Sequence, residues 1–300
     1  MIYLLLSILA SVLLLVNFRL HPHFGIQTRQ AIVFNYPFCV ATGLILMPEG
    51  QVFSLDLTQT WTWIALGLGI AFIITFVLSG LATQRMGLTL TSLANNISLV
   101  IPVLFSLWVF QNSGRAFDIW NYAGLGLALV AVVLSTFKPE EKTNETSIAK
   151  NNAWWLIIAV FVMYGMTNTV INYMNIHYIP NPEETIPVTL VMLVGAIGAG
   201  IILLVRDVFV GKEKIAPKNI AAGIALGIPN FLSFYWLLLA LRAFGNSGAL
   251  VYPLYNIGVI LVAALVGIGF FKEKIRRVNQ AGLVLAVIAI LLISYQEIFS

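Results

Sequence analysis

NYAGLGLA at residues 121–128 returns later in the chain as NQAGLVLA at residues 279–286. Six of the eight positions are identical, and an offset of 158 residues aligns the two stretches. Two segments rich in Leu, Ala and Gly can match by composition alone, but a clustered and ungapped match favours an internal repeat. The same offset extends the match through these further pairs: Gly69 with Gly227, Phe76 with Phe234, and Gly87 with Gly245.

Apolar side chains dominate the 300 residues of the chain. Hydrophobic residues make up 60% and charged residues 9%, and the mean hydropathy is +0.94. A soluble domain carries about 25% charged residues. So few charges cannot cover a globular surface in water, and the composition predicts an all-α integral membrane protein.

Ten stretches approach the length of about 20 apolar residues that a membrane-spanning helix needs. Their continuous apolarity, without alternation, excludes a strand barrel. The first stretch contains no Lys or Arg before Arg19, so it is interpreted as a retained helix and not as a signal peptide. The expected spans are 2–18, 28–47, 61–83, 88–110, 117–137, 153–174, 185–205, 219–241, 247–271 and 278–298.

The spans divide evenly between the two copies of the repeat. Residues 1–137 form the first five-helix repeat, residues 153–300 form the second, and the polar linker 138–152 joins them. Five is an odd number, so the second copy enters the membrane from the opposite side. We therefore expect ten transmembrane helices arranged as two inverted five-helix repeats, which is typical of secondary transporters.

Four stretches carry a resemblance to a known family: 87–110, 121–134, 245–274 and 279–292. Through them the whole chain resembles the drug/metabolite transporter superfamily, in its ten-helix EamA-like branch. The resemblance implies a central cavity lined by the first, third, fourth, sixth, eighth and ninth helices, with both termini in the cytoplasm. The family's usual acidic residue after the ninth helix matches Glu273, whereas the equivalent position in the first half is Arg115.

Positive charge predicts the opposite orientation. Lys and Arg concentrate in cytoplasmic loops of membrane proteins. Fourteen of the sixteen basic residues lie in loops that follow odd-numbered spans, and only Arg115 and Arg242 lie in the even-numbered loops. We expect a multi-pass protein of the cytoplasmic membrane with the odd-numbered loops in the cytoplasm and both termini outside.

Polarity inside the expected spans comes from amides, hydroxyls and aromatic rings, because no Asp, Lys, Arg or His lies near a span centre. Asn95 and Ser98 share one helical face, as do Asn168 and Asn172. Such residues often hydrogen-bond neighbouring helices, but their concentration on a few spans favours a cavity. Asn95 and Asn96 are the strongest candidates, and the expected substrate-binding set is Asn95, Asn96, Ser98, Asn168, Asn172, Asn230, Trp236, Tyr252, Tyr255 and Asn256.

Pro102, Pro229 and Pro253 lie inside expected spans. Each removes a backbone donor. Each is either a static kink or a hinge that frees a carbonyl toward a cavity.

The sequence contains no nucleophile–base–acid set, phosphate-binding loop or cluster with metal-ligand spacing, so we expect no enzyme, no cofactor and no metal. Its net charge of +4 lies in loops, so nucleic acid is not an expected partner. The expected partners are membrane lipid and a small neutral or zwitterionic metabolite, with amino acids first, carried by alternating access. Two alternatives stay open: a multidrug or cation exporter, which needs Glu183 or Glu184 in the cavity, and a structural or lipid-handling protein. The oligomeric state is not set by the sequence.

Overall fold

The computed structural model describes residues 1–105, 118–137, 153–178, 185–211, 213–245 and 248–298. All regular structure in these ranges is helical. In chain order the helices are α1 (Ile2–Leu20), α2 (Thr28–Ile45), α3 (Thr60–Met86), α4 (Leu88–Ile97), α5 (Val100–Phe105), α6 (Ile119–Ser135), α7 (Trp154–His177), α8 (Thr185–Phe209), α9 (Pro217–Ala243), α10 (Gly248–Gly269), α11 (Arg277–Ile293) and α12 (Tyr295–Ile298).

Helix length and apolarity confirm a multi-pass membrane protein. Within the described ranges, seven segments are long and apolar enough to cross a bilayer: α1, α3, α4 with α5, α7, α8, α9 and α10. The apolar helices α6 and α11 have 17 residues each, about 26 Å of helix at 1.5 Å per residue. Large apolar side chains such as Trp63, Ile202 and Leu265 are more than half exposed. Exposed apolar surface of this extent requires lipid in place of water.

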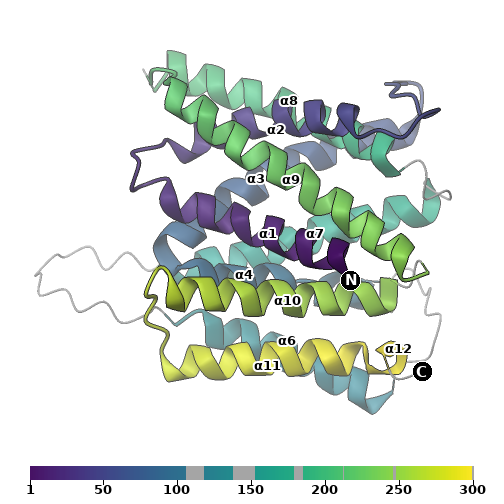
Figure 1. Cartoon of the computed structure of the whole chain (residues 1–300), viewed down its shortest axis with the longest axis vertical. Coiled ribbons are helices and arrows are strands. Elements are labelled where there is room, and N and C mark those ends of the chain that lie inside the picture. Colours follow the sequence, from purple (N-terminus) through teal and green to yellow (C-terminus); the bar gives the residue numbers. More distant parts are fainter. Residues whose placement is uncertain (106–117, 138–152, 179–184, 212, 246–247, 299–300) are drawn as a thin grey trace, which may run out of the picture.

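The long helices lie side by side, and both chain termini lie at one end of the bundle (Figure 1). We call this the termini end, and the end that holds the loops after α1, α3, α8 and α10 the opposite end. The helices α2, α8 and α9 gather at one edge, and α6 pairs with α11 at the other edge. Between these edges, α1, α3, α4, α7 and α10 form the centre of the bundle.

Glycines let the backbones of neighbouring helices approach closely. A methyl group added at Gly69 of α3 would collide with the Met192 carbonyl of α8, and one at Gly227 of α9 would collide with the Asn35 carbonyl of α2. Small residues at such crossings are typical of packed membrane helices. Gly69 and Gly227 are 158 positions apart, the same offset that separates residues 121–128 from 279–286.

The expected span at 88–110 differs from the structure. Helix α4 ends at Ile97 and α5 begins at Val100, so this segment is broken in the described part of the span. The Ser98 hydroxyl donates to the Asn95 carbonyl, 2.6 Å away, at the break. Pro102 lies in the first turn of α5, where its missing N–H costs no helical hydrogen bond. Helices α9 and α10, by contrast, continue through Pro229 and Pro253.

Candidate functional site

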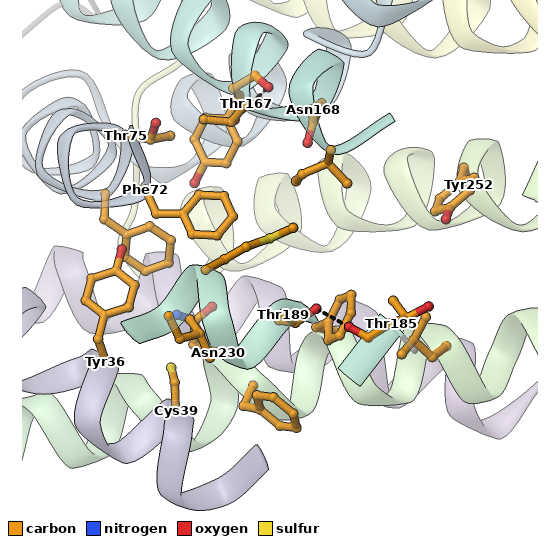
Figure 2. Close-up of a pocket in the computed structure, with 18 of the residues that line it drawn as sticks. Tyr36, Cys39, Phe72, Thr75, Thr167, Asn168, Thr185, Thr189, Asn230 and Tyr252 are labelled. Atoms are coloured by element: carbon orange, nitrogen blue, oxygen red, sulfur yellow. Dashed lines mark hydrogen bonds between the residues drawn. The ribbon is translucent and has the colours of Figure 1, made fainter. Parts of the chain in front are cut away.

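A cavity of about 520 Å³ lies among six helices that come from both halves of the chain. Cavities of this size hold small organic molecules. Figure 2 shows side chains from opposite walls pointing into the space. The lining consists of Tyr36 and Cys39 of α2; Phe72, Thr75 and Phe76 of α3; Tyr164, Thr167, Asn168 and Ile171 of α7; Thr185, Thr189, Met192 and Leu193 of α8; Asn230, Phe231, Phe234, Leu238, Leu241 and Arg242 of α9; and Tyr252 of α10.

The cavity extends from the middle of the bundle toward the termini end. Its deep residues, Tyr36 and Asn230, lie near the centres of α2 and α9, whereas Arg242 and Thr185 lie at helix ends. Asn230 and Arg242 are twelve residues apart on one helix, which separates them by about 18 Å along its axis. Arg242 therefore belongs to the mouth, and the deep part of the cavity is formed without it.

Tyr36 brings an unsatisfied polar group to the deep part. Its side chain is 1% exposed, and its hydroxyl has no hydrogen-bond partner among the described residues. The ring packs against Phe76 with centroids 6.0 Å apart, which holds the tyrosine in place. A buried hydroxyl without a partner is costly, so water or a bound solute must supply one.

Amides from α2 and α9 meet beside Tyr36. The Asn230 side chain donates to the Asn35 side-chain oxygen at 3.2 Å, and the Cys39 thiol lies 3.5 Å from the same oxygen. The thiol also lies 3.2 Å from the Gly227 carbonyl. The side-chain nitrogen of Asn35 is buried and has no hydrogen-bond partner in the described structure. This cluster fixes the orientation of Asn230 at the cavity wall.

The remaining walls are aromatic and hydroxylic. Seven aromatic rings line the cavity: Tyr36, Phe72, Phe76, Tyr164, Phe231, Phe234 and Tyr252. Arg242 is the one charged side chain among the described lining residues, and no carboxylate belongs to that set. Glu183 and Glu184, which the multidrug alternative requires, lie outside the described residues. The described walls therefore present a largely apolar surface with a few uncharged polar groups.

Ion pairs and amide hydrogen bonds join the helices at the opposite end. The Arg29 guanidinium contacts Asp207 at 3.0 Å and Glu213 at 3.4 Å. The Asn219 side chain donates to the side-chain oxygen of Gln30 at 2.7 Å. These contacts link α2 to α8, to α9 and to the connection between them, and they lie beyond the deep end of the cavity.

Glu273 closes a second part of the opposite end. Its carboxylate accepts from the backbone N–H groups of Leu88 at 2.6 Å and Thr89 at 3.1 Å, and from the Thr89 hydroxyl at 2.9 Å. The carboxylate thus caps the start of α4, where a negative charge is favoured by the helix dipole. Arg19 lies 3.9 Å from the same carboxylate and donates to the Gln84 carbonyl at 2.9 Å.

Comparison with known proteins supports the fold and leaves the activity open. No family model matches the chain. An uncharacterized protein of Haemophilus influenzae is 24% identical over 298 residues, which cover 98% of each chain. One solved structure, described as a crystal structure of a protein, is similar in fold. The alignment covers 97% of this chain and 94% of the chain in that structure, with a TM-score of 0.56 and 16% sequence identity. That likeness shows a shared fold alone.

The cavity brings together three of the residues expected to bind substrate: Asn168, Asn230 and Tyr252. These three come from α7, α9 and α10. The other seven lie outside its lining: Asn95, Asn96, Ser98, Asn172, Trp236, Tyr255 and Asn256.

Three of these seven side chains bond to protein groups instead, and one of them is Ser98, whose hydroxyl donates to the Asn95 carbonyl. Asn96 donates within α4 to the Ser92 carbonyl at 2.8 Å. The Tyr255 hydroxyl lies 2.6 Å from that of Ser11, across the α1–α10 contact.

Sequence reasoning overlooked Tyr36, Cys39 and Thr189 as site residues. The available signal was the run Asn35-Tyr36-Pro37 inside an otherwise apolar span. Each of three prolines inside the helices, Pro37, Pro229 and Pro253, directly adjoins a cavity-lining residue. The hinge role expected for Pro102, Pro229 and Pro253 stays a prediction.

Proposed function

We propose that the chain is a secondary transporter that carries a small neutral or zwitterionic metabolite by alternating access. The observation that carries the proposal is the 520 Å³ cavity, which reaches the termini end and stops short of the polar contacts at the opposite end. A carrier of this type exposes a central site to one side of the membrane at a time. The polar contacts around Arg29 and Glu273 are the groups that would separate when the opposite side opens.

Ten spans in two inverted repeats form the proposed framework. Equivalent contacts support it: Gly124 of α6 faces the Ala289 carbonyl of α11, and Gly282 of α11 faces the Ala131 carbonyl of α6. Each residue of the first contact is 158 positions from its counterpart in the second. An exchange of this kind is what a two-fold axis between antiparallel repeats produces. The resemblance to the drug/metabolite transporter superfamily is part of the same proposal.

The lining supports a net-neutral solute over a permanent cation. Moving an unpaired charge to mid-membrane is costly, and the described lining contains no carboxylate to compensate a cation. A zwitterion brings its own counter-charge, and its apolar part would contact the aromatic walls. The cavity itself gives a non-transport structural role no support, because a purely structural bundle gains nothing from an open interior.

We infer the orientation of the chain in the membrane from the distribution of Lys and Arg among its loops. The opposite end carries the odd-numbered loops, which hold most of the basic residues, so we place that end in the cytoplasm. In this arrangement the structure corresponds to an outward-open state.

The test is solute flux through the purified protein. The full chain is reconstituted into liposomes, and pools of radiolabelled amino acids and other neutral metabolites are offered outside. Time-dependent accumulation of at least one solute, abolished by excess unlabelled solute, is expected. Absence of saturable flux for every pool, with protein that remains folded in the liposomes, would overturn the proposal.

A further inference from the structure

Three of the threonines that line the cavity donate their hydroxyl protons to backbone carbonyls of their own helices. Thr75 donates to the Ala71 carbonyl and Thr189 to the Thr185 carbonyl, each at 2.7 Å. Thr167 lies 3.0 Å from the Met163 carbonyl and donates within its own helix in the same way. A hydroxyl has one proton and two acceptor lone pairs. These three side chains therefore offer a solute acceptors and no donors.

These threonines can become donors to a solute only if an existing hydrogen bond breaks. To donate to a solute, each threonine would first lose its bond to its own helix. The carbonyl would keep only its backbone N–H bond, and neither lipid nor the apolar rings of the cavity would replace the lost hydroxyl donor. The acceptors lie on three helices, α3, α7 and α8, with Thr75 and Thr167 on one side of the space and Thr189 on the other (Figure 2).

Donors in the deep cavity are fewer and weaker. The Tyr36 hydroxyl is unpartnered, Asn168 contributes an amide, and Asn230 has already used one amide hydrogen on Asn35. The Arg242 guanidinium lies about 18 Å farther along α9 from Asn230, too far to reach the same small solute. A carboxylate in the deep cavity would thus find only neutral donors.

We propose that the feature this cavity recognises is a protonated primary amine, a refinement that rests on the proposed transport function. An ammonium group has three donors and no acceptor, which complements a wall whose threonine hydroxyls offer only acceptors. The aromatic rings add attraction, because an ammonium within about 6 Å of a ring face is stabilised by the ring quadrupole. A carboxylate on the same solute is tolerated, and it restores net neutrality.

Three solutes with one carbon skeleton separate these features. Leucine carries both charged groups, 3-methylbutylamine lacks the carboxylate, and 4-methylpentanoate lacks the amine. Binding is measured with the detergent-purified full chain by isothermal titration at neutral pH. We expect leucine to bind most tightly, the amine about tenfold more weakly because it brings no counter-charge, and the acid at least about a hundredfold more weakly, in line with the strength of charged hydrogen bonds.

Matched threonine substitutions assign the recognition to the cavity. Thr75→Val removes an acceptor at nearly constant shape, and we expect it to weaken amine binding about tenfold. Thr83→Val is the control, because Thr83 lies on the same helix, is buried, and donates to the Ser79 carbonyl at 2.8 Å, but lies outside the cavity. Thr75→Ser keeps the oxygen and should restore the affinity.

The outcomes separate this refinement from the transport proposal. Saturable flux of some solute, combined with acid binding equal to amine binding, would overturn amine recognition and leave transport standing. Equal losses in Thr75→Val and Thr83→Val, or no binding of any of the three solutes, would also overturn it. Amine-selective binding without flux would instead support the proposed amine recognition and contradict the proposed transport function.

Discussion

Asn121 of α6 and Asn279 of α11 form reciprocal hydrogen bonds at the two ends of the α6–α11 pair. The Asn121 side chain donates to the Leu292 and Ile293 carbonyls of α11, at 3.2 and 2.9 Å. The Asn279 side chain donates to the Leu134 carbonyl in the last turn of α6 and to the Phe137 carbonyl just after that helix, at 2.9 and 3.0 Å. Each amide thus satisfies carbonyls at the end of the other helix, which have no partner of their own.

This exchange predicts similar losses of stability for Asn121→Leu and Asn279→Leu. Interhelical hydrogen bonds in membranes contribute about 0.6 kcal/mol each on average, so each variant should lose roughly 1 kcal/mol, or about 2–4 °C in Tm. Asn121→Leu should lose slightly more, because Asn121 also accepts from the Asp118 N–H at 3.0 Å. Thermal unfolding in detergent measures both. Gln280→Leu, on the exposed side of α11, is the control, and an equal loss there would refute the assignment.

Asn168→Ala should reduce transport without lowering Tm. Its side chain lines the cavity, and the described structure gives it no hydrogen bond to protein that the substitution would break. Asn96→Ala should do the reverse, because the amide of Asn96 donates to Ser92 inside α4 and lies outside the cavity. Flux and melting temperature are measured on both. If Asn96→Ala abolishes flux in a fully folded protein, Asn96 reaches the substrate in another state and the cavity described above is incomplete.

Arg29→Gln should loosen the opposite end, because it removes the ion pairs to Asp207 and Glu213. The reporter is a cysteine in place of Gln30, which is fully buried, in a Cys39→Ser background. We expect faster modification by a water-soluble maleimide in detergent. Arg85→Gln removes a basic side chain from an exposed position at the same end and serves as the control. Equal labelling rates with and without Arg29 would show that these ion pairs do not keep the end closed.

Orientation is tested with two exposed loop positions in intact cells. His23→Cys lies in the connection after α1, and Ser54→Cys lies in the connection after α2, both in the Cys39→Ser background. The charge bias predicts that a membrane-impermeant thiol reagent labels Ser54→Cys and spares His23→Cys. The family resemblance predicts the reverse pattern. Permeabilised cells should show labelling of both, which confirms that each cysteine is reactive.

Acid should destabilise the fold through His21. Burial lowers the pKa of His21 from its usual 6.5 to about 4, so the folded state holds the neutral imidazole while the unfolded chain binds a proton. The stability from this residue is complete above pH 6.5 and declines as the pH falls toward 4. The loss should reach roughly 2 kcal/mol near pH 5. The Tm of the wild type should therefore fall between about pH 7.5 and pH 5 by more than that of His21→Gln, and parallel curves would contradict this account.

The sequence predicts the helical membrane class well, because both composition and continuous apolar runs depend on local residue choice. It also identifies Asn168, Asn230 and Tyr252 as members of one polar set, and the structure places these three around one space. Helical periodicity supplies the face that a side chain occupies. It does not supply the identity of the helix that covers that face.

Asn96 illustrates the missing information. Two adjacent amides in an apolar span must each find a partner, but the partner of Asn96 is one turn back in its own helix. Tyr36 illustrates the converse, since a single tyrosine beside a proline gives no periodic signal. Its importance comes from an unpaired hydroxyl, and pairing depends on α3 and α9, which are distant in the sequence. Three-dimensional packing decides both cases.

The contact between Glu273 and the start of α4 also has a consequence for biosynthesis. The carboxylate and the Leu88 N–H that it accepts from are 185 residues apart in the chain. During translation, the first helical turn of α4 must therefore wait, uncapped, until most of the remaining protein has been made. A nascent chain truncated before residue 273 cannot complete this turn by itself. Such fragments should be substrates for membrane quality control, and a separately synthesised C-terminal fragment that contains Glu273 should rescue them.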